Sequence, residues 1–164
     1  MDIAEDLRRT ALQEERLQFG AFDAETAWAL GTELKRAGEA REAKIVVDIR
    51  LTTMELLSFA LPGAAPDNFD WVRRKRNVVF HFHRSSYAVG LELERDKTSL
   101  EAGPWALPAR DYAAHGGSFP IFIRGTGVIG AVSVSGLPKR EDHAMVVEAL
   151  SKILGVDIAD ARLD

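Results

Sequence analysis

The chain has 164 residues, of which 46% are hydrophobic and 28% charged, a composition typical of a globular protein and unlike that of a disordered one. Its 21 basic and 25 acidic residues leave a net charge of −4. Because this gives no positive field to hold a polyanion, nucleic-acid binding is not expected. The absence of cysteine excludes disulfides, thiolate metal sites and thiol nucleophiles.

The first residues predict a helix. From Asp2 to Leu17 the apolar residues recur at helical spacing. This charged segment lacks the basic and apolar regions of a signal peptide, and no run of about 18 uncharged apolar residues provides a membrane span. We therefore expect a cytoplasmic protein with one domain over residues 1–164, of which 1–20 form an N-terminal helix.

A second helix and a hairpin are expected next. Asp23 is placed to cap a helix over Thr26 to Ala37, and Gly38 is placed to end it. The β-branched run from Lys44 to Leu51 predicts a strand, and MELLSFALPG after a threonine pair predicts its antiparallel partner.

Asp67 and Asp70 flank the start of residues 69–82, FDWVRRKRNVVFHF, and place negative charge where a helix N-terminus favours it. Trp71, Val78 and Phe82 form one apolar stripe, and Arg73, Arg74, Arg76 and Asn77 are expected mainly away from it. The end of the segment, VVFHF, fits a strand equally well.

The second half of the chain predicts two helices and two strands. Ser85 or Ser86 is placed to cap a short helix. Residues 96–117, rich in glycine and proline, are expected to be irregular, with one helical turn near 109–114; long loops of this kind are often functional. The remaining elements are strands at Phe119–Arg124 and Val128–Ser135, joined by Gly125-Thr126-Gly127, and a helix at Glu141–Leu154.

The strongest local charge is the cluster Arg73, Arg74, Lys75 and Arg76, with Arg84 further on. Guanidinium groups pair bidentately with carboxylates and phosphates, so this cluster is suited to a phosphate, a carboxylate or a heme propionate. The alternative is a solvated helix face, or salt bridges to an acidic patch on a neighbouring subunit.

The histidines do not predict a zinc site. His81 and His83 are two residues apart, so in a helix they point in nearly opposite directions, and in a strand no third ligand lies nearby. One imidazole is enough for a single axial heme ligand, and the candidates are His81, His83, His115 and His143.

Two turns are candidate binding segments. In HGGSFP, Gly116 and Gly117 after His115 would let a ligand approach the main-chain amides, unless they only make the turn into the strand. In SGLPKREDH, Asp142 is suited either to cap the last helix or to orient His143 for acid–base chemistry. The alternative for the second turn is a cap followed by an exposed histidine.

Other catalytic and nucleotide motifs are absent. The G-x-G of RGTGVIG joins two strands instead of opening a helix, so it is not a nucleotide fingerprint. No G-x-S-x-G is present, so no Ser–His–Asp triad is indicated.

The segments WVRRKRNVV, HRSSYAVGL and FPIFIRGTGVIGAVSVSGLPKREDHAMVVEAL resemble an uncharacterised UPF-series family related to the GlcG/HbpS-like heme-degrading-domain proteins. The resemblance extends roughly from Asp6 to Leu154. It is carried by the Arg-Lys-Arg-Asn and Ser-Gly-Leu-Pro runs, the GG-x-x-P-I strand and the V-I-G-A-V-x-V-S-G strand. The helix that Asp142 leads carries it too.

This resemblance implies an α+β, profilin-like fold, in which helices cover both faces of a central antiparallel sheet of about five strands. It also implies a homo-oligomer, and some members of the superfamily bind or degrade heme or bind corrinoids. The matched positions are Gly116, Gly117, Ser135, Gly136 and Asp142. Arg73, Lys75 and Arg76 match only the closer family.

The leading hypothesis is therefore a cytoplasmic, oligomeric ligand-binding domain for heme or a similar anionic cofactor. The alternative is a non-catalytic assembly or protein-interaction module that uses the Arg73–Arg76 face and the 96–117 loop. The candidate binding residues are Arg73, Lys75, Arg76, His115, Gly116, Gly117, Arg124, Ser135, Gly136, Asp142 and His143.

Overall fold

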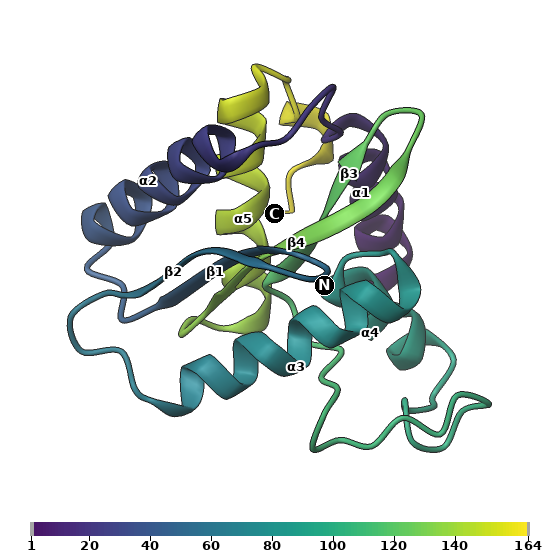
Figure 1. Ribbon diagram of the computed structural model, residues 1–164. Helices are drawn as coiled ribbons and strands as arrows, with labels where there is room; N and C mark the ends of the chain where they lie inside the picture. Colours follow the sequence, from purple (N-terminus) through teal and green to yellow (C-terminus); the bar gives the residue numbers. More distant parts are fainter. Residues whose placement is uncertain (1, 164) are drawn as a thin grey trace.

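The computed structural model describes residues 2–163 and arranges them as helices around one sheet (Figure 1). In chain order the elements are α1 (Ile3–Arg16), α2 (Ala24–Ala40), β1 (Val46–Leu51), β2 (Glu55–Ala60), α3 (Asp67–Phe82), α4 (Ser86–Arg95), β3 (Ser118–Ile123), β4 (Gly127–Ser135), α5 (Lys139–Leu154) and a final 3₁₀ turn (Ala159–Ala161).

The sheet has four strands in the order β2-β1-β4-β3, and all neighbours are antiparallel. The α+β fold is confirmed, but the expectation of about five strands is wrong for the described residues. Outside the four strands, the described residues form one isolated bridge, between Phe19 and β3. The Phe19 N–H donates to the Phe122 carbonyl, and the Phe19 carbonyl accepts from the Arg124 N–H. A single residue cannot form a fifth strand, and the chain turns away at Gly20.

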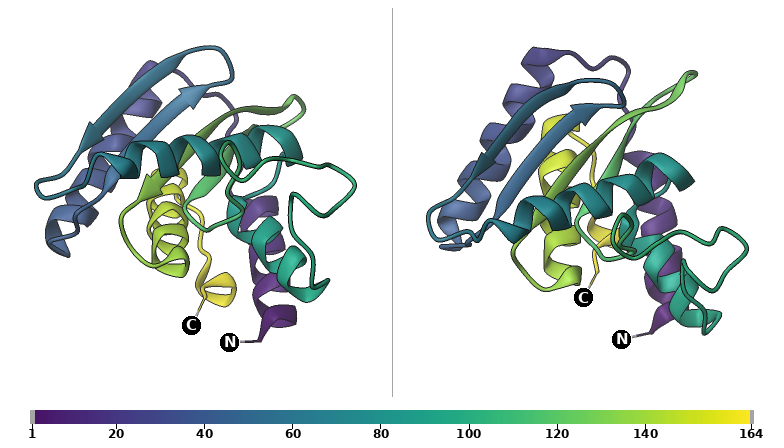
Figure 2. Two further views of the ribbon diagram at one scale, coloured as in Figure 1. Left: turned by 90° about the horizontal axis from the view of Figure 1, so that it is seen from below. Right: turned by 60° about the horizontal axis from the view of Figure 1, so that its bottom comes forward.

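Helices cover both faces of the sheet (Figure 2). Alternate side chains of β1 and β4, such as Val47 and Val132, face α2 and α5 and form the large apolar core. The other face meets α3 and carries buried polar groups, including Asp48 and Ser133. Because strand side chains alternate between faces, one face of this sheet is apolar and the other has polar groups beneath α3.

The helix ends agree largely with the sequence pattern. The Asp23 carboxylate accepts from the Thr26 N–H at 2.8 Å, and the Ser85 hydroxyl accepts from the Ala88 N–H at 3.2 Å, so both expected caps are confirmed. Gly38 does not end α2, which runs to Ala40. Its missing side chain instead allows close packing, since a Cβ there would lie 2.5 Å from Leu61.

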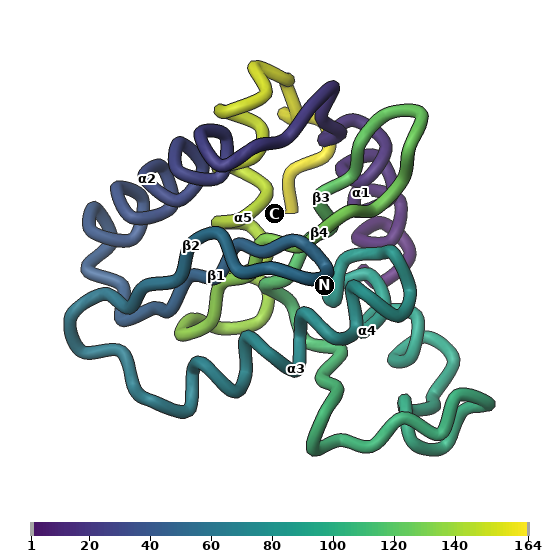
Figure 3. Tube along the Cα trace, viewed as in Figure 1, coloured from purple at the N-terminus to yellow at the C-terminus, as the bar shows by residue number. Residues whose placement is uncertain are grey.

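The segment VVFHF belongs to α3, which ends at His83 in a left-handed conformation with φ 54°. Beyond α4, residues 96–117 form a long excursion without helix or strand (Figure 3). The expected turn near 109–114 is one hydrogen-bonded turn in which the Asp111 and Tyr112 N–H groups donate to the Pro108 carbonyl. None of the described helices is long and apolar enough to span a bilayer.

Candidate functional site

An open pocket of about 230 Å³ lies where the first half of α3 meets the β4–α5 turn. Its walls come from α3, the loop before β3, the end of β4 and the start of α5. The lining residues are Asn68, Trp71, Lys75, His115, Ser135, Gly136, Leu137, Lys139 and Asp142.

A buried ion pair joins α3 to α5 at this pocket. Lys75 Nζ donates to Asp142 Oδ2 at 2.7 Å and to the Val134 carbonyl at 3.1 Å. The side chains of Lys75 and Asp142 are only 4% and 1% exposed. A charge removed from water is stable only when it is paired and hydrogen-bonded, so each group depends on the other.

Burial is the main influence on the protonation of this pair. It lowers the pKa of Lys75 and raises the pKa of Asp142, whereas the attraction between the two groups opposes both shifts. Asp142 Oδ1 also accepts from the Leu137 N–H at 3.0 Å, just ahead of α5. The expectation that Asp142 caps the last helix is wrong, because α5 begins at Lys139 and has no side-chain cap. The carboxylate instead holds the turn before α5 and fixes Lys75.

Gly116 and Gly117 bring the loop before β3 close to this pair. A Cβ at Gly116 would lie 1.9 Å from the Lys139 carbonyl. At Gly117, where φ is +123°, it would lie 2.3 Å from the Val134 carbonyl and 2.9 Å from Lys75 Nζ. Both glycines therefore allow backbone to pack where no side chain fits.

Replacing Gly117 by alanine is expected to lower the free energy of unfolding by about 3 kcal/mol, because backbone strain and the displacement of β4 and Lys75 add together. The matched control is Gly125→Ala: φ there is +78°, but nothing lies within 4 Å of the added Cβ. Urea unfolding should show a loss of only about 1 kcal/mol for the control. Equal losses in the two variants would contradict the packing explanation.

His115 and Trp71 form the rim of the pocket. Their ring centroids are 5.2 Å apart, and the Arg74 guanidinium lies 4.5 Å above the indole ring. Partial burial lowers the pKa of His115, and the positive charges of Lys75, Lys139 and Arg74 lower it further. The imidazole is therefore neutral at pH 7 and retains a lone pair for a ligand.

The structure brings five of the candidate residues together at the pocket lining, with both glycines beside it. The pocket contains Lys75, His115, Ser135, Gly136 and Asp142. The other four candidates, Arg73, Arg76, Arg124 and His143, do not line this pocket.

The charges of the basic cluster are largely neutralised within the chain. Arg73 bonds Asp70 and Asp111, and Arg84 bonds Glu14 and Glu92. No acidic patch on a neighbouring subunit is needed to balance these two arginines.

The alternative of a solvated helix face is wrong for Arg76. It is only 9% exposed, and its guanidinium donates to Asp48 of β1 at 2.6 Å. Arg50 contacts the same carboxylate at 3.2 Å. Because Asp48 lies buried on the sheet face beneath α3, it holds Arg76 there and makes it part of the structural framework.

Arg124 lies at the far end of the β3–β4 hairpin, where its guanidinium donates to the Gln18 carbonyl at 2.9 Å. His81 and His83, at the end of α3, are both exposed. A shallow pocket at His81 has only Asn77, Phe80 and Tyr112 as its other lining residues, so no cation lies in its wall.

His143 is fully buried, so the expectation of an exposed histidine after the cap is wrong. Its Nε2 lies 2.8 Å from Gln13 Oε1, while Gln13 Nε2 donates to the Ala161 carbonyl. The amide oxygen must therefore accept, so Nε2 carries the proton. The Nδ1 atom then has a lone pair but no hydrogen-bond partner among the described residues. Burial, followed by the charge of Arg140, lowers the pKa of His143 to about 3.

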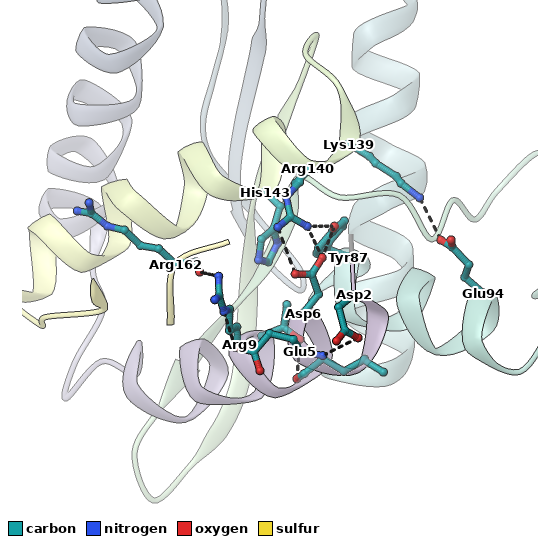
Figure 4. A network of polar contacts seen from close by, with 12 residues as sticks. Asp2, Glu5, Asp6, Arg9, Tyr87, Glu94, Lys139, Arg140, His143 and Arg162 are labelled. Atoms are coloured by element: carbon teal, nitrogen blue, oxygen red, sulfur yellow. Dashed lines mark hydrogen bonds and ion pairs between the residues drawn. The ribbon is translucent and has the colours of Figure 1, made fainter. Parts of the chain in front are cut away.

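A polar network next to His143 docks α1 onto α4 and α5 (Figure 4). Arg140 pairs with Asp6 and donates to the Tyr87 hydroxyl at 3.0 Å, and the Tyr87 and His143 rings lie 4.9 Å apart. His143 thus belongs to the attachment of the N-terminal helix. Acid–base chemistry at the pocket is excluded for it, because no part of its ring is exposed.

Sequence reasoning missed Asn68, Trp71, Leu137 and Lys139 as pocket residues. One signal was available: Asn68, Trp71 and Lys75 are spaced i, i+3 and i+7, which puts them on one face of a helix. This spacing was not recognised as a pocket wall, because Trp71 was assigned to the apolar stripe of the helix.

The matching family model is described as "Haem degrading protein HbpS-like" and covers residues 22–151. The UPF0303 protein of Rhizobium meliloti strain 1021 is 57% identical over the whole chain and 99% of its own length. That of Azotobacter vinelandii strain DJ is 53% identical over the whole chain and 98% of its own length.

Solved structures share the fold. The Ybr137w protein matches with a TM-score of 0.84 at 27% identity, over 91% of this chain and 87% of its own. HbpS matches with a TM-score of 0.63 at 18% identity, over 84% of this chain and 93% of its own. A structure described as a PduOC:heme complex matches with a TM-score of 0.65 at 15% identity, over 80% of this chain and 94% of its own. Together with the family model and the close relatives, these matches show that the chain belongs to the UPF0303 family and has an HbpS-like domain.

Proposed function

We propose that the protein is a ligand-binding domain whose pocket at Lys75, His115 and Lys139 takes the anionic group of a cofactor, with heme as the leading candidate. The observation that carries this proposal is the position of His115. It is the histidine that combines an accessible, neutral imidazole with cationic neighbours in a pocket wall.

Lys139 is the cation most available to a ligand. Asp142 compensates the charge of Lys75, whereas the ion pair of Lys139 with Glu94 measures 3.4 Å between side chains that are 46% and 43% exposed. An exposed pair of this kind contributes little free energy. An incoming carboxylate or phosphate therefore displaces Glu94 at small cost.

The donor set fits heme in two respects. A neutral imidazole such as that of His115 is a common axial ligand, and lysine or arginine at the rim pairs with propionates. Since 230 Å³ is small for a cofactor site, the pocket would receive an edge of the macrocycle. Iron would supply the redox or oxygen chemistry, and this chain would supply one imidazole and cations for the propionates.

The relatives support the same class of ligand. The matched family model is named for heme degradation, and one structural match is described as a heme complex. We confine the proposal to binding, in the cytoplasmic setting that the sequence predicts.

A hemin titration followed by absorbance tests this function. The intact protein is expected to shift the Soret band at roughly micromolar hemin, and His115→Ala to weaken binding at least tenfold. His81→Ala, which removes an exposed histidine outside the pocket, is the matched control and should bind normally. Unchanged hemin affinity in His115→Ala would contradict the proposal.

A second proposal concerns the expected homo-oligomer, and the open edge of the sheet supports it. Within residues 2–163 β2 pairs only with β1, and beside this edge Trp28 is 63% exposed. Trp28, Gly31, Leu57 and Phe59 line an apolar groove there. A second copy of β2, related by a two-fold axis, would satisfy the unpaired backbone groups and cover the groove.

Trp28→Glu is therefore expected to shift the protein to a smaller species in size-exclusion chromatography with light scattering, because like charges would meet near the two-fold axis. Phe69→Glu, at a 46% exposed residue of α3, is the control and should leave the molar mass unchanged. Identical molar masses for Trp28→Glu and the unmodified protein would contradict this assembly.

A further inference from the structure

A second, larger pocket adjoins the candidate site. It has a volume of about 350 Å³ and lies between α4 and the 96–117 loop. His115 and Lys139 line both pockets, so the two cavities meet at these side chains. Other lining residues of the second pocket include Arg74, Leu93, Glu94, Thr98, Leu100 and Tyr112.

Hydrogen bonds to α3 hold the outer wall of this second pocket in place. Arg74 Nε donates to the Ala109 carbonyl at 2.8 Å, and the Arg74 carbonyl accepts from the Ala113 N–H at 3.1 Å. One turn further along α3, Asn77 Nδ2 donates to the Asp111 carbonyl at 2.8 Å. The loop is irregular in shape but fixed against the helix.

The opposite wall is fixed by a close contact between backbones. A Cβ at Gly90 of α4 would lie 2.2 Å from the Ala114 carbonyl, so the helix and the loop touch directly there. With both walls fixed, the pocket exists before any ligand arrives, which lowers the entropic cost of binding.

The second pocket provides apolar surface beside its charged residues. Leu93, Leu100, Tyr112 and Ala114 in the second pocket belong to the smaller apolar cluster of the protein. The buried ion pair of Lys75 and Asp142 belongs to the first pocket alone. Lys139 stands between the two, and its ammonium group reaches towards Glu94 of α4 and away from the network around Arg140 (Figure 4).

From this arrangement we infer that the two pockets form one bipartite site for an amphipathic anion. The anionic group lies in the first pocket, the ligand crosses at His115 and Lys139, and its apolar body lies against Leu93 and Tyr112 in the second. Lys139 exchanges Glu94 for the ligand. This inference rests on the proposed function, because it assumes an anion in the first pocket, and it adds the class of molecule attached to that anion.

Linear carboxylates of increasing length test this inference. Calorimetric titrations of the intact protein would use butyrate, hexanoate, octanoate and decanoate below their micellar concentrations. Once the chain reaches the second pocket, affinity is expected to rise about fourfold for each further buried methylene. Lys139→Ala should weaken the binding of every length by a similar factor.

Thr98→Trp is the decisive variant, because Thr98 is an exposed residue of the second pocket wall and does not line the first. It is expected to abolish the rise in affinity with chain length and to leave the affinity for butyrate unchanged. A chain-length gain that persists in Thr98→Trp would overturn the inference, as would equal affinities for butyrate and decanoate.

These outcomes can be separated from a failure of the proposed function. If hemin binds through His115 but affinity does not rise with chain length, the bipartite site is wrong and the first pocket stands. If neither hemin nor any carboxylate binds, both proposals fail. Near-ultraviolet circular dichroism of Thr98→Trp, expected to retain the native bands of the other aromatic residues, confirms that the variant is folded.

Discussion

Replacing Lys75 by methionine is expected to lower the free energy of unfolding by about 3–5 kcal/mol, because it leaves the Asp142 carboxylate buried without its cation. The methionine side chain has nearly the same length, so lost packing contributes little. The loss should appear as a lower midpoint in urea unfolding followed by circular dichroism.

Two further variants identify the cause. The double variant Lys75→Met, Asp142→Asn removes both charges but keeps an acceptor for the Leu137 N–H, and it should recover most of the stability. Arg73→Met removes a cation whose pairs with Asp70 and Asp111 are exposed, and should cost less than about 1 kcal/mol. If Lys75→Met lowers the free energy of unfolding by less than about 1 kcal/mol, Lys75 and Asp142 do not form the buried ion pair described here.

The second large effect is a dependence of stability on pH that arises from His143. Its pKa is about 3 in the folded protein, compared with 6.5 for an ordinary histidine. Between these values the unfolded chain binds one proton more than the folded chain. This contribution to stability is therefore complete above pH 6.5 and is lost progressively as the pH falls towards 3, at about 1.4 kcal/mol per pH unit.

Other groups titrate in the same range, so the test is a difference between proteins. His143→Phe removes the titrating ring and the unpartnered Nδ1 atom, and its unfolding free energy should depend less steeply on pH between 3 and 6.5. His81→Phe, at an exposed residue, should keep the slope of the unmodified protein. Parallel pH profiles for His143→Phe and the unmodified protein would show that the buried ring does not titrate as described.

Much of the fold follows from local patterns in the sequence. Helical periodicity, β-branched runs and the positions of Asp23 and Ser85 are properties of neighbouring residues, and each predicted an element that the structure contains. The fifth strand is an implication of the family resemblance. The one further segment that we found to fit a strand, VVFHF, forms the end of α3. The single bridge at Phe19 leaves no trace in hydrophobic periodicity.

The site was predictable only in part, because its geometry depends on long-range pairs. Lys75 and Arg76 resemble surface residues in sequence, since their partners Asp142 and Asp48 lie 67 and 28 positions away. The burial of His143 likewise depends on Gln13, 130 positions away. Gly117, in contrast, stands out in the sequence, because a double glycine before a strand is a local signal. The structure shows close approach there by the Val134 carbonyl and Lys75, whereas approach of a ligand to this loop stays a prediction.

The central claim is that an anionic cofactor binds at His115, and histidine NMR tests it most directly. Protein labelled with ¹⁵N-histidine would be titrated with gallium protoporphyrin, a diamagnetic analogue of heme. The ring signals of His115 are predicted to shift, while those of His81, His83 and the buried His143 stay in place. Shifts at His81 or His83 with none at His115 would contradict the assignment of the site.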